Sequence, residues 1–202
     1  GQAMHGSADY RIDERRGEGD FRLRATIVAD VVLHGLMAGT TFWADANDDA
    51  QPQPDEVQWV PAIYQASGYC SWSMFVAPDL SFIASVKEGK ESRVVRLPVA
   101  TFTACGAPRY APDQATPVPA LGLPSLDGKH LLAWTDSRIT CYSLTDGSPR
   151  WSFPNTFSGV HGSHHAPAAE LGLLRGSFGV VGAAALPGPV GQFWALNGNC
   201  GE

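Results

Sequence analysis

The stretch that decides the fold is Gly128 to Phe153, GKHLLAWTDSRITCYSLTDGSPRWSF. It begins with an apolar run, turns at residues 136–137 and continues as an alternating run over residues 139–144. A second turn at residues 146–147 precedes a third run that closes on Trp151. Alternating apolar and polar residues with turn formers between the runs are typical of antiparallel strands joined by tight turns. The stretch therefore predicts three consecutive antiparallel strands.

Two weaker copies of this pattern flank it, at residues 81–97 and 176–202. Aligned on Val95, Tyr142 and Trp194, the copies are spaced 47 and 52 residues apart, near the length of one four-stranded propeller blade. The pattern resembles the blade repeat of the pyrroloquinoline-quinone-type (PQQ-like) β-propellers, in which a turn, a "YALD"-like strand, a "TG" turn and a tryptophan recur. The resemblance implies an all-β propeller or a propeller-derived repeat. It covers the blade pattern and not the quinone chemistry, because no two cysteines are adjacent.

A further blade is expected upstream, where residues 20–33 alternate ahead of another strand-like run. At about 45 residues per blade the chain holds four to five blades, which is close to the minimum for closure. We therefore expect about four blades, either closed or incomplete. Residues 1–8 are interpreted as a terminal tail or a cloning scar. Residues 9–202 are predicted to form a single propeller-like domain with a calcium-loop insertion at residues 43–58.

The sharpest chemical signal is the acidic segment DANDDAQPQPDE at residues 45–56. It has oxygen-bearing side chains at positions 1, 3, 5 and 12 of the calcium loop D-x-[DN]-x-[DN]-G-x5-E. The predicted ligands of Ca²⁺ are the side chains of Asp45, Asn47, Asp49 and Glu56 and the main-chain carbonyl of Gln51. The alternative is a solvated turn, rich in Asp and Asn, that binds nothing.

The segment departs from the calcium-loop pattern at two positions. Ala50 stands where a glycine normally turns the chain through positive φ, and this should cost about 1–2 kcal/mol. Pro52 has no N–H with which to pair a second loop of the same kind. We therefore expect a single calcium loop, with a strand before it and one short helical turn at its end.

Composition excludes several classes of protein. Charged residues are 17% of the chain, and 22 glycines and 15 prolines favour many short strands joined by turns. A net charge of −6 provides no basic surface for nucleic acid. No apolar run reaches the length of about 18 residues that a membrane span needs, so none is predicted.

The four cysteines, Cys70, Cys105, Cys141 and Cys200, lack the CxxC spacing of a zinc or redox site, and they allow three pairings. With the calcium signal and the low charge, they favour an oxidising compartment. We therefore expect an extracellular or periplasmic protein with disulfides. The alternative is four buried thiols that pack as small hydrophobic side chains.

Two further segments lie between the repeats. Residues 103–127 contain five prolines and are predicted to be an extended crossing loop with few hydrogen bonds. His161, His164 and His165 lie in a segment rich in Gly and Ser, and neutral imidazoles suit Zn²⁺ or Cu²⁺. Their spacing matches no fixed metal motif, so a plain polar loop is the alternative to a second metal site.

Motifs for serine hydrolysis, phosphate binding and dinucleotide binding are absent, and we therefore expect no catalysis. The favoured function is a secreted structural or interaction module, stabilised by calcium, that self-assembles into oligomers or filaments by strand completion between copies. Its partners would be other copies of itself or another secreted protein, and carbohydrate stacking on tryptophans is a further candidate. The alternative is a fragment of a secreted propeller enzyme or binding protein that acts on sugars or alcohols, with the three histidines at the propeller mouth.

Overall fold

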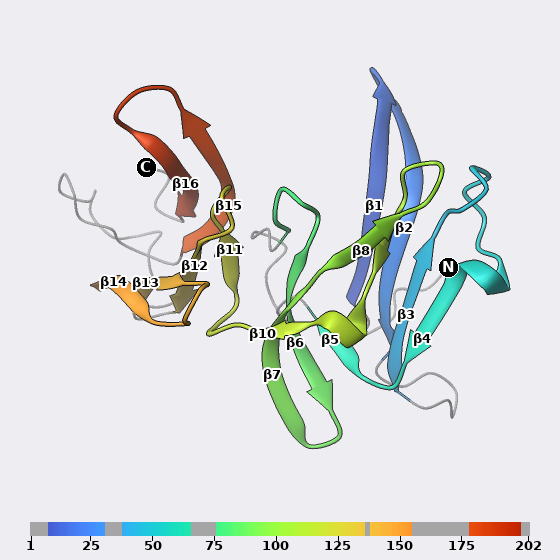
Figure 1. Cartoon of the computed structure of the whole chain (residues 1–202), viewed down its shortest axis with the longest axis horizontal. Helices are drawn as coiled ribbons and strands as arrows, with labels where there is room; N and C mark the ends of the chain where they lie inside the picture. The colour runs from blue at the N-terminus through green and yellow to red at the C-terminus, as the bar shows by residue number, and fades with distance from the viewer. Residues whose placement is uncertain (1–7, 31–37, 66–75, 136–137, 155–177, 199–202) are drawn as a thin grey trace. The chain divides into compact units, whose positions relative to one another are not determined.

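The computed structural model of this chain describes residues 8–30, 38–65, 76–135, 138–154 and 178–198. These residues form antiparallel β-strands in five sheets with two short 3₁₀ helices (Figure 1). The predicted all-β class is confirmed, and none of the sheets in the described residues closes on itself. No helix within these ranges is long and apolar enough to cross a membrane.

Contacts between Cα atoms divide the chain into two compact units, which are described separately. Unit 1 comprises Gly1–Gly68 and Asp79–Pro117, and unit 2 comprises Tyr69–Pro78 and Val118–Glu202.

The first sheet of unit 1 is an antiparallel meander of four strands in chain order. The strands are β1 (Ala8–Gly17), β2 (Asp20–Asp30), β3 (Gly39–Ala44) and β4 (Val57–Val60). Alternate residues of β2 are buried, with Ala25 and Ile27 at 0% and 2% exposure, because one face of the sheet covers the core. The acidic segment 45–56 joins β3 to β4 and ends in the 3₁₀ helix η1 (Pro54–Glu56). The predicted insertion therefore lies within one sheet.

Gly39 allows β3 and β4 to approach closely. A Cβ atom at Gly39 would lie 2.5 Å from the carbonyl oxygen of Val60 and 2.6 Å from the indole ring of Trp59. Only glycine fits at this position, because the Val60 carbonyl oxygen belongs to the backbone and cannot move aside as a side chain can.

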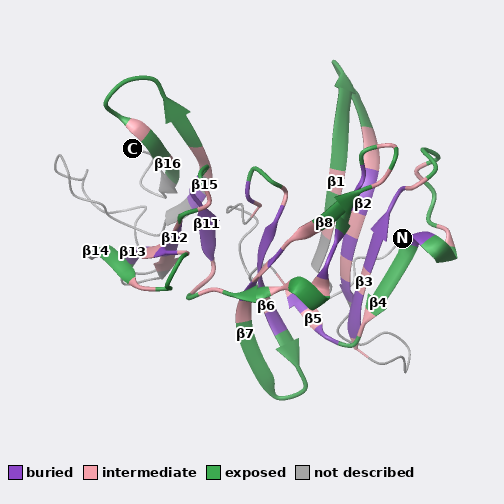
Figure 2. Ribbon diagram, in the orientation of Figure 1, coloured by how far each residue is buried: buried purple, intermediate pink, exposed green. Residues whose placement is uncertain are grey.

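The second sheet of unit 1 has the order β10-β7-β6-β5. Its strands are β5 (Ile63–Gln65), β6 (Phe82–Glu88), β7 (Glu91–Leu97) and β10 (Thr116–Pro117). A hairpin of β8 (Val99–Phe102) and β9 (Pro108–Tyr110) forms a small third sheet, followed by the 3₁₀ helix η2 (Pro112–Gln114). The core joins these parts through aromatic side chains in edge contacts: ring centroids are 5.5 Å apart in both Phe42–Tyr64 and Phe82–Tyr110. Buried residues of β3, β5 and β6 contribute to this core (Figure 2).

Unit 2 begins with another four-stranded meander in chain order. The strands are β11 (Gly122–Pro124), β12 (His130–Thr135), β13 (Arg138–Ser143) and β14 (Pro149–Pro154). A two-stranded sheet follows, made of β15 (Phe178–Leu186) and β16 (Gly191–Gly198). The three strands predicted from residues 128–153 are confirmed as β12, β13 and β14.

The core of unit 2 lies between the meander and the β15–β16 hairpin. Leu123, Leu132, Ile139, Cys141 and Val180 form a buried cluster, and Trp134, Ala183 and Trp194 pack against it. The indole Nε1 of Trp194 donates a hydrogen bond to the carbonyl oxygen of Leu123 at 3.2 Å. Packing of the hairpin against the meander therefore supplies the core of unit 2.

The prediction of an extended loop for the proline-rich stretch is wrong. Residues 103–127 do not form one crossing loop, because β9, β10 and β11 all lie within this range. Proline is tolerated at these places since Pro108 begins its strand, whereas Pro117 and Pro124 end theirs.

Candidate functional site

The candidate site is the acidic loop, residues 45–56, between β3 and β4. Three backbone N–H groups donate to side chains in the first half of the loop: Asp48 to Asp45 Oδ1 at 2.9 Å, Asp49 to Asn47 Oδ1 at 3.1 Å, and Gln51 to Asp49 Oδ1 at 2.7 Å. The backbone passes through positive φ at Asp48 (67°) and at Ala50 (58°). The left-handed turn predicted for Ala50 is therefore confirmed.

Glu56, the last residue of the loop, closes its neck. Its Oε1 accepts a hydrogen bond from the N–H of Ala46 at 2.7 Å. Its Oε2 accepts from Trp43 Nε1 at 2.8 Å and from the N–H of Gln53 at 3.3 Å. Burial raises the pKa of this carboxyl, but the three donors lower it by more, so the net shift of the pKa is downward. Glu56, at position 12 of the loop, is therefore hydrogen-bonded back to Ala46, at position 2.

A guanidinium from β2 neutralises the buried start of the loop. Arg24 Nη1 donates to Asp45 Oδ2 at 3.1 Å and to Asp48 Oδ1 at 2.6 Å, and Arg24 Nε donates to Glu14 Oε2 at 2.8 Å. The side chain of Asp45 is fully buried and that of Arg24 is 8% exposed. The hydrogen bonds to Asp48 and Glu14 raise the pKa of Arg24, and the bond from Arg24 lowers the pKa of Asp48. The chain therefore supplies its own cation to the loop.

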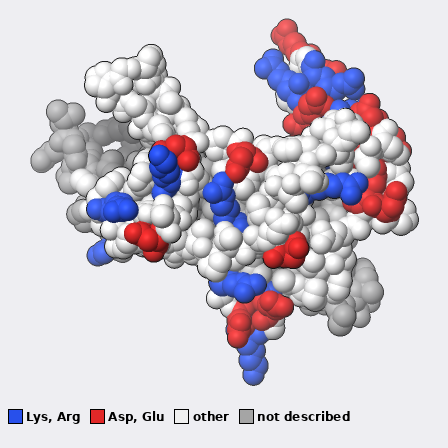
Figure 3. Space-filling model, viewed as in Figure 1, with Lys and Arg blue, Asp and Glu red and all other residues white. Residues whose placement is uncertain are grey.

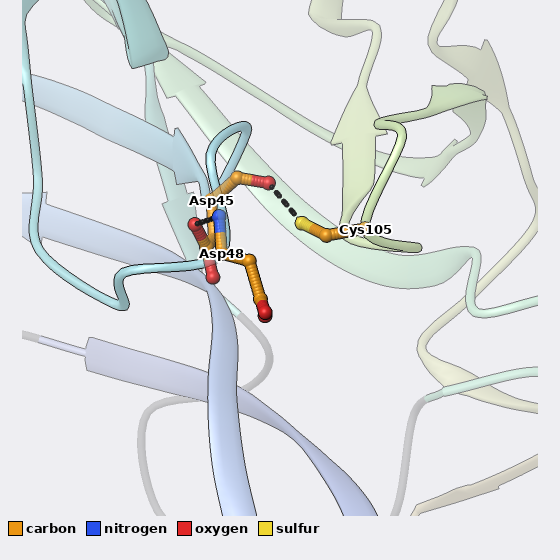
Figure 4. A group of neighbouring side chains, drawn as sticks. All are labelled: Asp45, Asp48 and Cys105. Atoms are coloured by element: carbon orange, nitrogen blue, oxygen red, sulfur yellow. Dashed lines mark hydrogen bonds between the residues drawn. The ribbon is translucent and has the colours of Figure 1, made fainter.

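The turn between β8 and β9 also reaches the loop. Thr103 Oγ1 donates to the main-chain carbonyl oxygen of Asp45 at 2.8 Å. Cys105 Sγ donates to the same oxygen at 3.0 Å (Figure 4). Among the described residues, Asp45, Asp48 and Cys105 form the group of His, Cys, Asp or Glu side chains whose ligand atoms all lie within 4.8 Å of one another. The carboxylates of Asp45, Asp49 and Glu56 form no such group.

Sequence reasoning missed the residues that surround the loop most closely. Arg24 lies 21 positions before Asp45, and Thr103 and Cys105 lie 58 and 60 positions after it. Arg24 belongs to a strand with several other charged residues, so no local pattern distinguishes it from a solvated side chain. Asp48 occupies position 4, to which the calcium-loop pattern assigns no ligand.

The donor set of the loop fits a calcium ion in its chemistry. Five oxygen donors lie in twelve residues, and the backbone already turns at Ala50 as such a loop must. However, Arg24 already neutralises Asp45, so an ion at this carboxylate would have to compete with a buried guanidinium. The Cys105 thiol is too soft a donor to be a preferred calcium ligand, since calcium selects oxygen.

A groove lies beside the loop, still within unit 1. It has a volume of about 290 Å³ and is bounded by β3, β4, the β8–β9 hairpin and η2. Its charged lining residues include Asp55, Arg109 and Asp113. This volume is at the lower end of the range for small-molecule sites, so the groove has room for a small ligand only.

Of the predicted cysteines and histidines, only two cysteines lie within the described residues. Cys105 and Cys141 are free thiols, and Cys70 and Cys200 lie outside the described residues, so the predicted disulfides are not confirmed. Burial raises the pKa of the Cys141 thiol. His161, His164 and His165 also lie outside the described residues, and the second metal site stays a prediction.

No protein-family model, no curated protein and no solved structure matches this chain. The resemblance to the PQQ-like blade therefore stays a prediction from the residues alone.

Proposed function

We propose that the chain is a secreted, non-catalytic structural or interaction module, built of propeller-type blades and assembled with other copies through open sheet edges. The observation that carries this proposal is the order of the sheets. Two are four-stranded antiparallel meanders in chain order, and a third has three consecutive strands plus the short β10. Four-stranded antiparallel sheets repeated along the chain are the units of β-propellers. Val95, Tyr142 and Trp194, which align the repeats, lie on β7, β13 and β16.

Exposed apolar side chains on the edges of these sheets support assembly. Trp59 on the edge strand β4 is 46% exposed, and Trp151 on the edge strand β14 is 49% exposed. Large apolar residues beside an unpaired strand edge favour the docking of another strand, because main-chain hydrogen bonds and apolar burial then act together.

The test is sedimentation velocity of the purified chain over a range of concentrations, with negative-stain imaging of the same samples. Oligomers or filaments are expected, and their mass should rise with concentration. A monomer at all concentrations would overturn the assembly proposal. Attention would then pass to the alternative, an enzyme or binding protein for sugars or alcohols, and to the histidine segment.

We further propose that Ca²⁺ stabilises the module through Asp45, Asn47, Asp49, Glu56 and the carbonyl of Gln51. Its support is the donor set and the backbone of the loop described above. Calcium is expected to raise the melting temperature, because an ion that binds only the folded state stabilises it. Arg24 should weaken the affinity, since it holds Asp45 as a competing cation.

Thermal unfolding with calcium and with chelator tests this second proposal. Asp49→Ala should remove most of the calcium-dependent rise in melting temperature. Asp55→Ala is the matched control, because Asp55 is an exposed acid of the same segment that is not a proposed ligand. Equal rises in both variants would place the ion elsewhere, and no rise in the unmodified protein would show that the loop binds no calcium.

A further inference from the structure

The β15–β16 hairpin is the longer of the two two-stranded sheets among the described residues, the other being β8–β9. Three other sheets of the described residues have four strands each. β16 pairs with β15 on one side, and no other described strand pairs with its second side. An unpaired strand edge presents a row of free N–H and C=O groups that another strand can join.

One face of the hairpin is apolar and exposed. Ala183 and Trp194 face the core of unit 2, so their neighbours Ala184 and Phe193, which pair with each other, face away from it. Leu186 and Val190 are 52% and 62% exposed. The range 178–198 contains no charged residue, and Figure 3 shows an uncharged surface over the end of the hairpin where its two strands are joined. Nothing on this element repels an apolar partner.

The edge strands of the other described sheets are less suited to long strand pairing than β16, because each of them is charged, contains proline or is short. β1 carries six charged residues among ten, and β14 begins and ends with proline. β9, β10 and β11 each contain proline. β4, β5 and β8 lack both features but have only three or four residues. β16 has eight residues with no charge and no proline.

The second edge of the hairpin is less suitable for pairing. β15 also lacks charge and proline, but its register with β16 shifts between Val180 and Gly182. The extra residue bends the strand and interrupts its ladder, which is one way in which proteins protect an edge. The regular edge is therefore that of β16.

We propose that β16 pairs antiparallel with β16 of a second copy of this chain, forming the four-stranded sheet β15-β16-β16′-β15′. This inference rests on the assembly function proposed above and names the strand that performs it. A second copy is the occupant for two reasons. Two hairpins together make four strands, the number in the three larger sheets, and two uncharged edges of the same sequence meet without repulsion. The pairing has twofold symmetry, so it closes as a dimer.

Ala195 is the position at which to test this pairing. It lies near the middle of β16, it is exposed, and its partner on β15 is Gly182. Twofold antiparallel pairing brings position 195 of one copy close to position 195 of the other, within reach of long side chains. Charges of the same sign there should repel, and charges of opposite sign should attract.

The experiment compares Ala195→Lys, Ala195→Glu and their equimolar mixture by sedimentation velocity. Each variant alone should lose the dimer, with at least a tenfold rise in its dissociation constant, and the mixture should recover it. Gln58→Lys is the matched control, because it places the same charge on the exposed edge strand β4, and it should leave the dimer intact. Far-UV circular dichroism and melting temperature identify any variant that fails to fold, and Ala195→Ser then replaces it as a neutral reference.

The outcomes separate this inference from the function on which it rests. Oligomers that survive both Ala195 variants but are lost in Gln58→Lys would overturn the β16 pairing and leave the assembly function standing. If both Ala195 variants lose the dimer and their mixture does not recover it, β16 pairs with a part of the second copy other than its β16. A monomeric unmodified chain would overturn both proposals.

Discussion

The acidic loop 45–56 and the turn between β13 and β14 are both built on aspartates, but different parts of the chain hold them. In the turn, Asp146 Oδ1 accepts hydrogen bonds from Ser148 N and Ser148 Oγ at 3.1 and 2.8 Å, and Gly147 takes the positive φ of 71°. In the loop, Asp45 depends on Arg24 from another strand and on the β8–β9 turn. The turn is locally encoded, whereas the loop is completed by the tertiary structure.

This difference predicts which substitutions act at a distance. A change in the turn should affect only its own hairpin, because its partners lie within a few residues. A change at the partners of the loop should release a buried charge, which is far more costly. Four predictions test the comparison.

The largest effect is expected from Arg24→Met, which leaves the buried Asp45 carboxylate without its cation. We expect unit 1 to lose about 3 kcal/mol of unfolding free energy, measured by urea denaturation. The control is Arg11→Met, since the Arg11–Asp13 pair is exposed and should contribute less than about 1 kcal/mol. Equal losses in the two variants would mean that the loop does not depend on Arg24.

Ala50→Gly should stabilise the loop by about 1 kcal/mol. Ala50 holds a φ of 58°, and glycine adopts this conformation without the strain that a Cβ atom causes. Urea denaturation of this variant and of the unmodified protein measures the difference in unfolding free energy. A loss of stability would mean that the contacts of the Ala50 methyl group outweigh its backbone strain.

Gly147→Ala should lower the unfolding free energy by about 1 kcal/mol, an effect similar in size and opposite in sign to that of Ala50→Gly. The nearest atom to an added Cβ is Pro119 Cγ at 3.7 Å, which is ordinary contact, so the cost comes from the positive φ alone. Thermal unfolding of unit 2 is the measurement. An unchanged melting temperature would show that the turn relaxes to another conformation.

The smallest effect on stability is expected when acid pH protonates Asp146 in the turn between β13 and β14. The Ser148 hydroxyl and N–H lower the pKa of Asp146 from 3.8 to about 2. Because the pKa is lower in the folded state, the stabilisation is fully present above about pH 4 and is lost as the pH falls through about 2. Carboxyl chemical shifts followed by NMR during titration would report the pKa of Asp146. A value near 3.8 would mean that these hydrogen bonds are not maintained in solution.

The parts of the fold that depend on local pattern were predictable from the sequence. Strands β12 to β14 follow from alternation between turn residues, and the left-handed Ala50 follows from its place in the calcium-loop pattern. Strands β9, β10 and β11 were missed because the five prolines of residues 103–127 indicate a linker when neighbours in space are unknown. Proline is nevertheless compatible with strand ends and edges.

The candidate site was predictable only in its loop. The pattern places Asp45, Asn47, Asp49 and Glu56 in one segment, but it cannot show which cation they meet. Arg24, Thr103 and Cys105 reach the loop through strand pairing and sheet packing, which sequence spacing does not reveal.

The close approach at Gly39 has an evolutionary consequence. Because a methyl group there would overlap the backbone carbonyl oxygen of Val60 as well as the Trp59 ring, a smaller side chain at position 59 alone would not make room for it. Homologous sequences that keep this strand pairing should therefore keep glycine at position 39, whatever stands at position 59, and this glycine provides a marker for finding distant relatives of this sheet.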